Sequence, residues 1–171
     1  AAQLDTTLPV TPIRNGSTIA LSGDEHVVRW SQDHMRKPAQ ENGEIYVGGP
    51  EERLEDRLIK WMKSRARETY VKDLAYYCER ANVELPKLSI GDARRRWGSC
   101  SGRKSIRLSW RLIMAPENVR RSVVAHEVAH LRHMDHSKRF YDLLDEIFEG
   151  DRRTADQWLK QPGAGLPLGG A

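Results

Sequence analysis

The stretch His126-Glu127-Val128-Ala129-His130, followed by a further histidine at His136, decides how this chain is interpreted. Two histidines four residues apart on a helix lie one turn above each other on the same face, so both imidazoles can reach one metal ion. Glu127 lies beside that face, where a carboxylate can take a proton from metal-bound water without being a ligand. The pattern therefore predicts zinc-dependent hydrolysis.

Chance is a poor explanation of this motif. A random arrangement of the same residues would give H-E-x-x-H in roughly one or two chains per hundred, and a further histidine at the distance of His136 lowers this to roughly one in two thousand. The flanks also fit a buried helix over residues 117–133, because Pro116 is a start signal and apolar residues recur at helical spacing. These apolar residues are Val119, Val123, Val124 and Leu131.

A third ligand cannot come from the same straight helix. His133 shares the angular face of His126, but seven residues place it about 10 Å further along the axis, too far for both to bind one ion. We therefore expect His133 to be exposed or to support a ligand rather than to be one.

The chain must fold back after the helix to supply the third ligand. Asp135 or Ser137 can cap a new helix, which places His136 in the turn between the two helices. We therefore expect His136 as the third ligand, because three histidines leave a fourth position open for water. Glu146 and Glu149 on the next helix remain alternative ligands.

The composition fits one soluble domain, or one domain with a small appendage. The chain has 171 residues, of which 39% are hydrophobic and 30% charged. Its apolar runs are shorter than the roughly 18 residues that span a bilayer, and its start lacks a secretion signal. We expect a cytoplasmic protein without a membrane partner, and the start at Ala1 is compatible with a trimmed segment. Cys78 and Cys100 are expected to be reduced and buried.

The net charge of +4 is concentrated in one stretch. Residues 94–121, which begin at Arg94 and end at Arg121, contain 9 basic residues and 1 acidic residue. This stretch leads directly into the predicted metal helix, where it could bind acidic peptides, nucleotides or nucleic acid. The alternative is an Arg-rich hairpin that is only solvated.

The first third of the chain is predicted to hold short strands and then one long helix. Residues 1–50 are rich in Gly, Pro, Thr and Ser, with β-like runs at 17–21, 26–30 and 44–47, so we expect a small β-meander or a loosely attached arm. Over residues 51–82 apolar residues recur every three or four positions, which predicts an amphipathic helix of about 45–50 Å. This helix is expected to back the metal helix.

The remaining pattern predicts a hairpin, the metal helix and a third helix. Residues 87–92 and 105–110 are predicted strands that form a hairpin, with a turn-rich loop at 94–102 between them. If the strand at 105–110 has a free edge, it can align an extended peptide by backbone hydrogen bonds. A third helix is expected over 140–148, ending at Gly150, and residues 155–159 are expected to add one turn.

Three blocks of this sequence resemble the YgjP-like metallopeptidase family, and the resemblance spans residues 44–159. The blocks are Arg96-Trp97-Gly98-Ser99-Cys100-Ser101; Leu108-Ser109-Trp110-Arg111-Leu112-Ile113 with Ala115-Pro116; and Val124-Ala125-His126-Glu127-Val128-Ala129-His130-Leu131 with His136-Ser137 and Phe140.

The resemblance implies an α+β fold related to the SprT-like and minimal zincin peptidases. In such a zincin-like core, a long helix and a short antiparallel sheet accompany the H-E-x-x-H helix and a following helix. It implies one zinc ion bound by His126, His130 and His136, with Glu127 as general base. His133 stands where metzincins place glycine, so their sharp turn is not implied. On this basis residues 51–161 are the expected metallopeptidase domain, preceded by the β-rich segment 1–50 and followed by a disordered tail at 162–171.

The substrate is predicted less sharply than the site. A peptide or protein substrate is favoured, with Arg96, Trp97, Arg111 and Tyr141 as candidate binding residues and Arg111 or Tyr141 as candidates for stabilising the oxyanion. Trp97 and Trp110 are also candidates for the core, which is the commoner place for tryptophan. Two alternatives remain: a zinc-dependent nucleotide hydrolase, since a pyrophosphatase activity is attached to some family members, and a nucleic-acid-binding module with a structural metal. The sequence makes no prediction about the oligomeric state.

Overall fold

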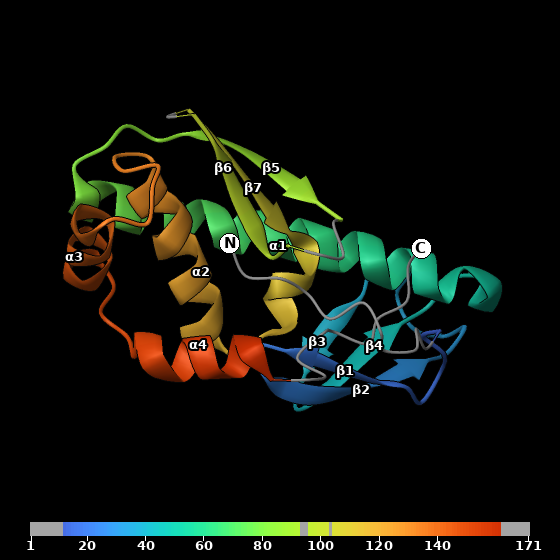
Figure 1. The fold of residues 1–171 in the computed structure, drawn as a ribbon. Coiled ribbons are helices and arrows are strands. Elements are labelled where there is room, and N and C mark those ends of the chain that lie inside the picture. The colour runs from blue at the N-terminus through green and yellow to red at the C-terminus, as the bar shows by residue number, and fades with distance from the viewer. Residues whose placement is uncertain (1–11, 93–95, 103, 162–171) are drawn as a thin grey trace.

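The computed structural model describes residues 12–92, 96–102 and 104–161, which form a mixed α+β fold with two small sheets (Figure 1). The predicted tail at 162–171 and Arg94 and Arg95 lie outside the described residues. The elements are β1 (Thr18–Leu21), β2 (Asp24–Trp30), β3 (Ala39–Glu41), β4 (Glu44–Val47), η1 (Glu51–Arg53), α1 (Leu54–Ala81), β5 (Lys87–Gly91), β6 (Gly98–Ser101), β7 (Ser105–Ser109), η2 (Trp110–Met114), α2 (Glu117–His130), α3 (Lys138–Ile147) and α4 (Arg152–Lys160).

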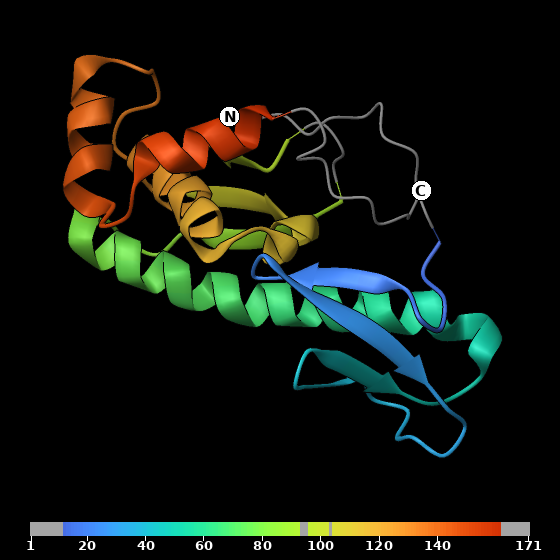
Figure 2. The same cartoon turned by 90° about the horizontal axis from the view of Figure 1, so that it is seen from below.

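The long helix α1 runs through the molecule and contributes to its core along its whole length. The prediction of this helix is confirmed. Its buried side chains recur at helical spacing from Leu54 to Ala81, and it ends where Asn82 takes a left-handed conformation with φ 54°. Figure 2 shows the first sheet along the N-terminal half of α1 and the other elements along its length. Helix α2 packs against α1, as expected of a backing helix.

The first sheet has the order β1-β2-β4-β3, so the prediction of a β-meander is wrong. Two tight hairpins, turning at Ser22-Gly23 and at Asn42-Gly43 with positive φ, are joined by a parallel pairing of β2 with β4. Strand β3 is exposed along its whole length, whereas β4 buries Ile45 and Val47. The apolar strand therefore takes the inner place that a meander would give to β3.

This sheet is packed against the helical part and is not a loosely attached arm. The backbone N–H groups of Ser22 and Gly23 donate to the carbonyls of Ile113 and Met114 in η2, each at 3.0 Å. The buried side chains of β1, β2 and β4 belong to the same core cluster as those of α1. The division of the chain into domains at residue 50 stays a prediction.

The second sheet has the order β5-β7-β6, which corrects three expectations. Strand β7 pairs in parallel with β5 and antiparallel with β6, so the hairpin before the metal helix is β6–β7. The expected loop at 94–102 includes β6, whose Gly-Ser-Cys-Ser sequence has too little apolar alternation to mark a strand. The strand predicted at 105–110 is therefore the central strand, and β5 and β6 are the two edge strands.

Three helices complete the fold after η2. Helix α2 begins after Pro116 and ends at His130, three residues earlier than expected. Ser137 caps α3, as predicted, and α4 is a full helix of 9 residues where one turn was expected. Among the described helices none is both long and apolar enough to cross a membrane.

Candidate metal centre

Three histidines converge at the C-terminal end of α2. His126 and His130 lie one turn apart, and the segment after α2 carries His136 back toward them. One ligand atom from each of the three lies within 4.8 Å of the others. The Nε2 atoms of His126 and His130 are 3.2 Å apart, close to the spacing of about 3.3 Å that two nitrogen ligands have around a tetrahedral zinc ion.

Burial keeps the imidazoles of His126 and His130 neutral and therefore able to bind a metal. Burial, followed by the neighbouring His130, lowers the pKa of His126 to about 3, and burial also lowers the pKa of His130. The backbone carbonyl of His133 lies 3.1 Å from Nδ1 of His130. A proton on Nδ1 is thereby held by this carbonyl, which leaves the lone pair of Nε2 for the metal. His133 thus orients the candidate ligand His130 through its backbone, and it does not belong to the histidine cluster itself.

Phe140 of α3 holds the three rings in place. Its ring stacks on His130 with centroids 4.4 Å apart and makes edge contacts with His126 and His136 at 4.9 and 5.1 Å. Phe140 is fully buried. A rigid aromatic wall therefore limits the rotamers of all three histidines, which favours metal binding.

Glu127 is buried beside the histidines without a close ionic partner. Its exposed fraction is 2%, and among the described residues its carboxylate has neither a hydrogen bond nor an ion pair. Burial raises the pKa of Glu127 to about 7, although the charge of Arg96 lowers it. A carboxylate that exchanges its proton near neutral pH is suited to general base chemistry.

Strand β6 forms a wall against Glu127. A Cβ atom at Gly98 would lie 3.2 Å from Cγ and 3.3 Å from Oε2 of Glu127, so glycine permits this close approach. Cys100 is half-buried nearby, and burial together with the charge of Glu127 raises the pKa of its thiol to about 11. Cys78 is buried elsewhere and forms no disulfide with Cys100, so both cysteines are free thiols. The Arg-Trp-Gly-Ser-Cys-Ser block thus adjoins the candidate base.

A cleft of about 340 Å³ opens over His126, Glu127 and His136. Helices α3 and α4 provide its other wall, and Figure 1 shows α4 lying across α2. Trp97 is fully buried at the start of β6 and packs against Trp158 of α4, with ring centroids 5.9 Å apart. The α4 residues that line the cleft are Arg152, Asp156, Leu159 and Lys160.

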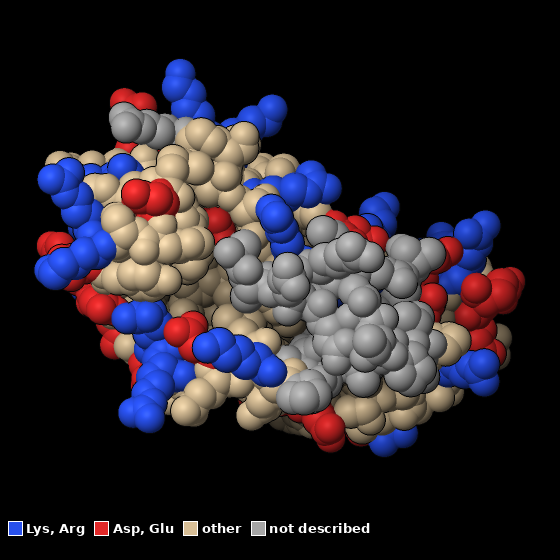
Figure 3. Space-filling model, viewed as in Figure 1, with Lys and Arg blue, Asp and Glu red and all other residues tan. Residues whose placement is uncertain are grey.

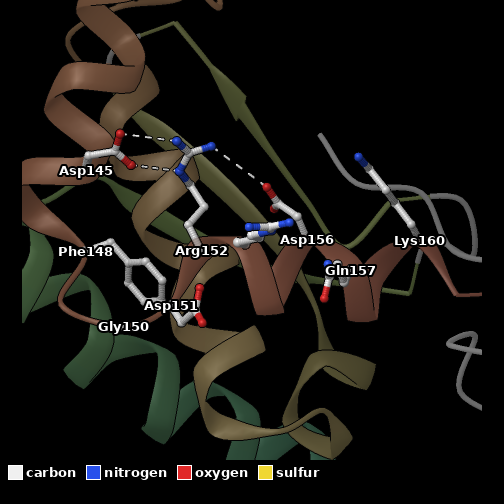
Figure 4. A pocket seen from close by; sticks show the side chains of 9 residues that line it. Asp145, Phe148, Gly150, Asp151, Arg152, Asp156, Gln157 and Lys160 are labelled. Carbon is white, nitrogen blue, oxygen red and sulfur yellow. Dashed lines mark hydrogen bonds and ion pairs between the residues drawn. The ribbon is translucent and has the colours of Figure 1, made fainter.

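Arg152 is held in a fixed position at this wall. Figure 4 shows its guanidinium between Asp145 of α3 and Asp156 of α4. Nε and one terminal nitrogen donate to the two oxygens of Asp145 at 2.8 and 3.2 Å, and Cζ lies 5.3 Å from the ring centroid of Tyr141. Sequence reasoning missed this wall, although Asp151 followed by apolar residues at helical spacing is an N-cap signal.

The predicted substrate residues do not all meet at the cleft. Tyr141 lines the cleft, with its ring centroid 6.2 Å from that of His136. Arg96 is exposed and acts on Glu127 through its charge. Trp97 and Trp110 are core residues. Arg111 is buried, pairs with Asp92, and is not among the residues that line the cleft.

The alternative carboxylate ligands are not part of the histidine cluster. Glu149 accepts hydrogen bonds from Tyr77 and Arg121, and Glu146 belongs to no metal-ligand cluster among the described residues. Half of the six described basic residues in this stretch are paired: Arg111 with Asp92, Arg120 with Asp73 at 2.8 Å, and Arg121 with Glu149 at 2.8 Å. These arginines stabilise the fold and are not available to the cleft.

Three histidines beside a buried glutamate form the arrangement expected of a metal-dependent hydrolase. A family model described as YgjP-like, metallopeptidase domain, matches residues 2–162, and the chain belongs to this family. Comparison with curated proteins and with solved structures found no match. Family membership supports a hydrolase and implies a metal, and the three histidines could hold that metal.

Proposed function

We propose that the protein is a zinc-dependent metallopeptidase with a zincin-like core formed by α1, the β5–β7 sheet, α2 and α3. The observation that carries this proposal is the cluster of His126, His130 and His136 beside the buried carboxylate of Glu127. Three imidazoles suit zinc, and the fourth position of a tetrahedral site would stay open for water. A structural site, by contrast, is usually closed by four protein ligands.

A zinc ion held there would acidify its water and polarise the substrate carbonyl. Glu127 takes the proton of the attacking water and returns it to the leaving amine. Its raised pKa of about 7 suits both steps, because the group gives and takes a proton near neutral pH. Tyr141 is the better candidate for stabilising the oxyanion, because it lines the cleft and Arg111 does not.

The edge of β6 that faces away from β7 pairs with no other described strand and is the candidate site for aligning a peptide. On its other side β6 pairs with β7, and Gly98 brings the strand next to Glu127. An extended peptide that added to this edge would lie beside the base through backbone hydrogen bonds, which demand little of its side chains. This proposal moves the predicted alignment from residues 105–110, which form the central strand, to β6.

The test measures bound zinc together with hydrolysis of peptides and of nucleoside triphosphates, in the native protein and in Glu127→Gln. We expect about one zinc ion in each protein, with peptide hydrolysis lowered about 10²- to 10⁴-fold in the variant. Glu84→Gln is the matched control. Glu84 is exposed and lies three residues after the end of α1, so this variant should keep full activity. A native protein without metal contradicts the zinc site, and cleavage of nucleotides but not of peptides contradicts the peptidase assignment.

A further inference from the structure

The N-terminal half of α1 carries a strong positive charge. Residues 57–72 contain six basic residues and one acidic residue, Glu68. Counted from residue 51 the excess is smaller, because residues 51–56 add four acidic residues and one basic residue. The six basic residues are Arg57, Lys60, Lys63, Arg65, Arg67 and Lys72.

The exposed basic side chains of this surface lack anionic partners. Among the described residues, Lys60, Lys63 and Arg67 make neither an ion pair nor a hydrogen bond through their side chains. Buried arginines elsewhere, such as Arg120 on α2, are paired with carboxylates. Unpaired cations at helical spacing repel one another, so a polyanion that binds them gains free energy from their neutralisation.

A hollow of about 440 Å³ joins this surface to the second sheet. Lys63 and Arg67 line it from α1, and Arg107 lines it from β7. A Cβ atom at Gly91 would lie 2.6 Å from Nε of Arg107, so glycine lets the arginine lie across β5. Asp92, the acidic residue of this hollow, already accepts hydrogen bonds from Trp110 and Arg111. Three cations therefore face the hollow against one carboxylate, Asp92, which is already paired with Arg111.

A second hollow, of about 320 Å³, continues the surface on the other flank of α1. Lys37, Arg65 and Lys72 contribute positive charge there against one negative charge from Glu68. Half-buried Trp61 contributes an aromatic ring, with Cζ of Arg65 5.1 Å from its centroid. The two hollows share Ser64, so they adjoin. From Lys60 to Lys72 the surface extends about 18 Å along the helix.

We propose that this surface, made of the exposed face of α1 from Lys60 to Lys72 together with Lys37 and Arg107, binds single-stranded nucleic acid. Phosphates pair with Lys63, Arg67 and Arg107, and a base stacks on Trp61. A narrow basic surface with hollows and an aromatic ring suits a single strand better than a flat lipid surface, which favours an apolar helix face.

The surface is distinct from the cleft of the proposed peptidase. None of the residues that line the two hollows lines the cleft. Around the cleft, Figure 3 shows Lys and Arg side chains over α3 and α4 next to Asp and Glu side chains, so that face is mixed in charge. The proposal does not depend on the metal centre and can fail or succeed separately from it.

The test measures binding of the full chain to a fluorescein-labelled 20-nucleotide single strand by fluorescence anisotropy at several salt concentrations. We expect Lys63→Glu/Arg67→Glu to weaken binding about tenfold or more and to flatten the slope of log affinity against log salt by about 1.4, which corresponds to two phosphate contacts. The control Lys138→Glu/Arg139→Glu makes the same charge change on the exposed start of α3 and changes the affinity less than about twofold. Thermal melting checks that each variant is folded.

A second variant tests the stacking. Trp61→Ala lowers the affinity about fivefold or more and leaves the salt slope unchanged, because it removes a base contact and no phosphate contact. Equal losses in the two charge-reversal variants, full affinity in Trp61→Ala, or an absence of binding overturn the proposal. Binding to anionic phosphatidylglycerol vesicles without binding to the oligonucleotide overturns it as well.

Discussion

The two sides of helix α2 handle buried polar groups in opposite ways. On the side toward α1, Arg120 and Arg121 meet Asp73 and Glu149, and Tyr77 donates to Glu149. On the cleft side, Glu127 is at least as deeply buried as Asp73, yet it lacks an ion pair among the described residues. On the α1 side the charged groups are paired with one another, whereas on the cleft side the carboxylate of Glu127 is left available to a ligand.

This difference teaches how structural and functional polar groups can be separated in one helix. A buried ion pair with complete hydrogen bonds costs little free energy and fixes the packing of α1 against α2. A buried carboxylate without such a partner destabilises the metal-free protein, and this cost is tolerated where chemistry needs the group. Four changes, ordered by expected effect, test this contrast.

Removal of a histidine from the cluster is expected to have the largest effect. His136→Ala takes away one of three ligands, so metal affinity falls by more than the roughly 100-fold that loss of a supporting partner costs, and hydrolysis falls to background. His133→Ala is the matched control, because His130 is held by the backbone carbonyl of residue 133. Metal titration and peptide hydrolysis are measured for both variants. If His133→Ala loses metal as strongly as His136→Ala, the assignment of His136 as the third ligand is contradicted.

Breaking the paired side of α2 is expected to act on stability. Asp73→Ala leaves the buried guanidinium of Arg120 without its main partner and lowers the free energy of unfolding by about 3–5 kcal/mol. Urea unfolding measures the change. The control, Asp142→Ala, breaks the exposed pair with Lys138 and changes the stability little. If both variants lower the free energy of unfolding equally, the buried pair stabilises the fold no more than the exposed pair does.

Replacing Glu127 is expected to stabilise the metal-free protein at high pH. Burial raises the folded-state pKa of Glu127 from 4.5 to about 7, so its contribution is fully present below about pH 4.5 and is lost as the pH rises through about 7. Glu127→Gln removes this loss. The free energy of unfolding therefore rises by up to about 3 kcal/mol at pH 8.5 and hardly changes at pH 4.5. Unfolding in urea with a chelator at both pH values measures it; a gain that does not vary with pH contradicts the raised pKa.

The smallest effect is expected at the glycine that touches Glu127. Gly98→Ala places a methyl group 2.9 Å from Cδ2 of Leu108 and 3.2 Å from Cγ of Glu127, which costs about 1–3 kcal/mol of stability and shifts the carboxylate. Peptide hydrolysis should fall about tenfold or more, with bound zinc retained. Ser99→Ala on the same strand is the control. Unchanged activity in Gly98→Ala would show that β6 does not position the base.

Much of the helical structure could be predicted because its determinants are local. The 3.6-residue periodicity marks α1 and α2, and Ser137 marks the start of α3. The strand order could not be predicted, because pairing partners are chosen by long-range burial. Strand β6 is the clearest case, since its Gly98 and Ser99 have low strand propensity and pair with β7 only through tertiary packing.

The sequence by itself determined the candidate ligands and the base, because i, i+4 spacing on a helix fixes which side chains share a face. It also determined that His133 lies off the cluster. Only the tertiary structure decided which charges are free: in the predicted basic stretch, Arg111, Arg120 and Arg121 are paired with carboxylates from other parts of the chain. The cleft wall from α4 and the unpaired cations of α1 likewise depend on which surfaces pack together. Burial and ion pairing join residues far apart in the chain, so local patterns do not contain them.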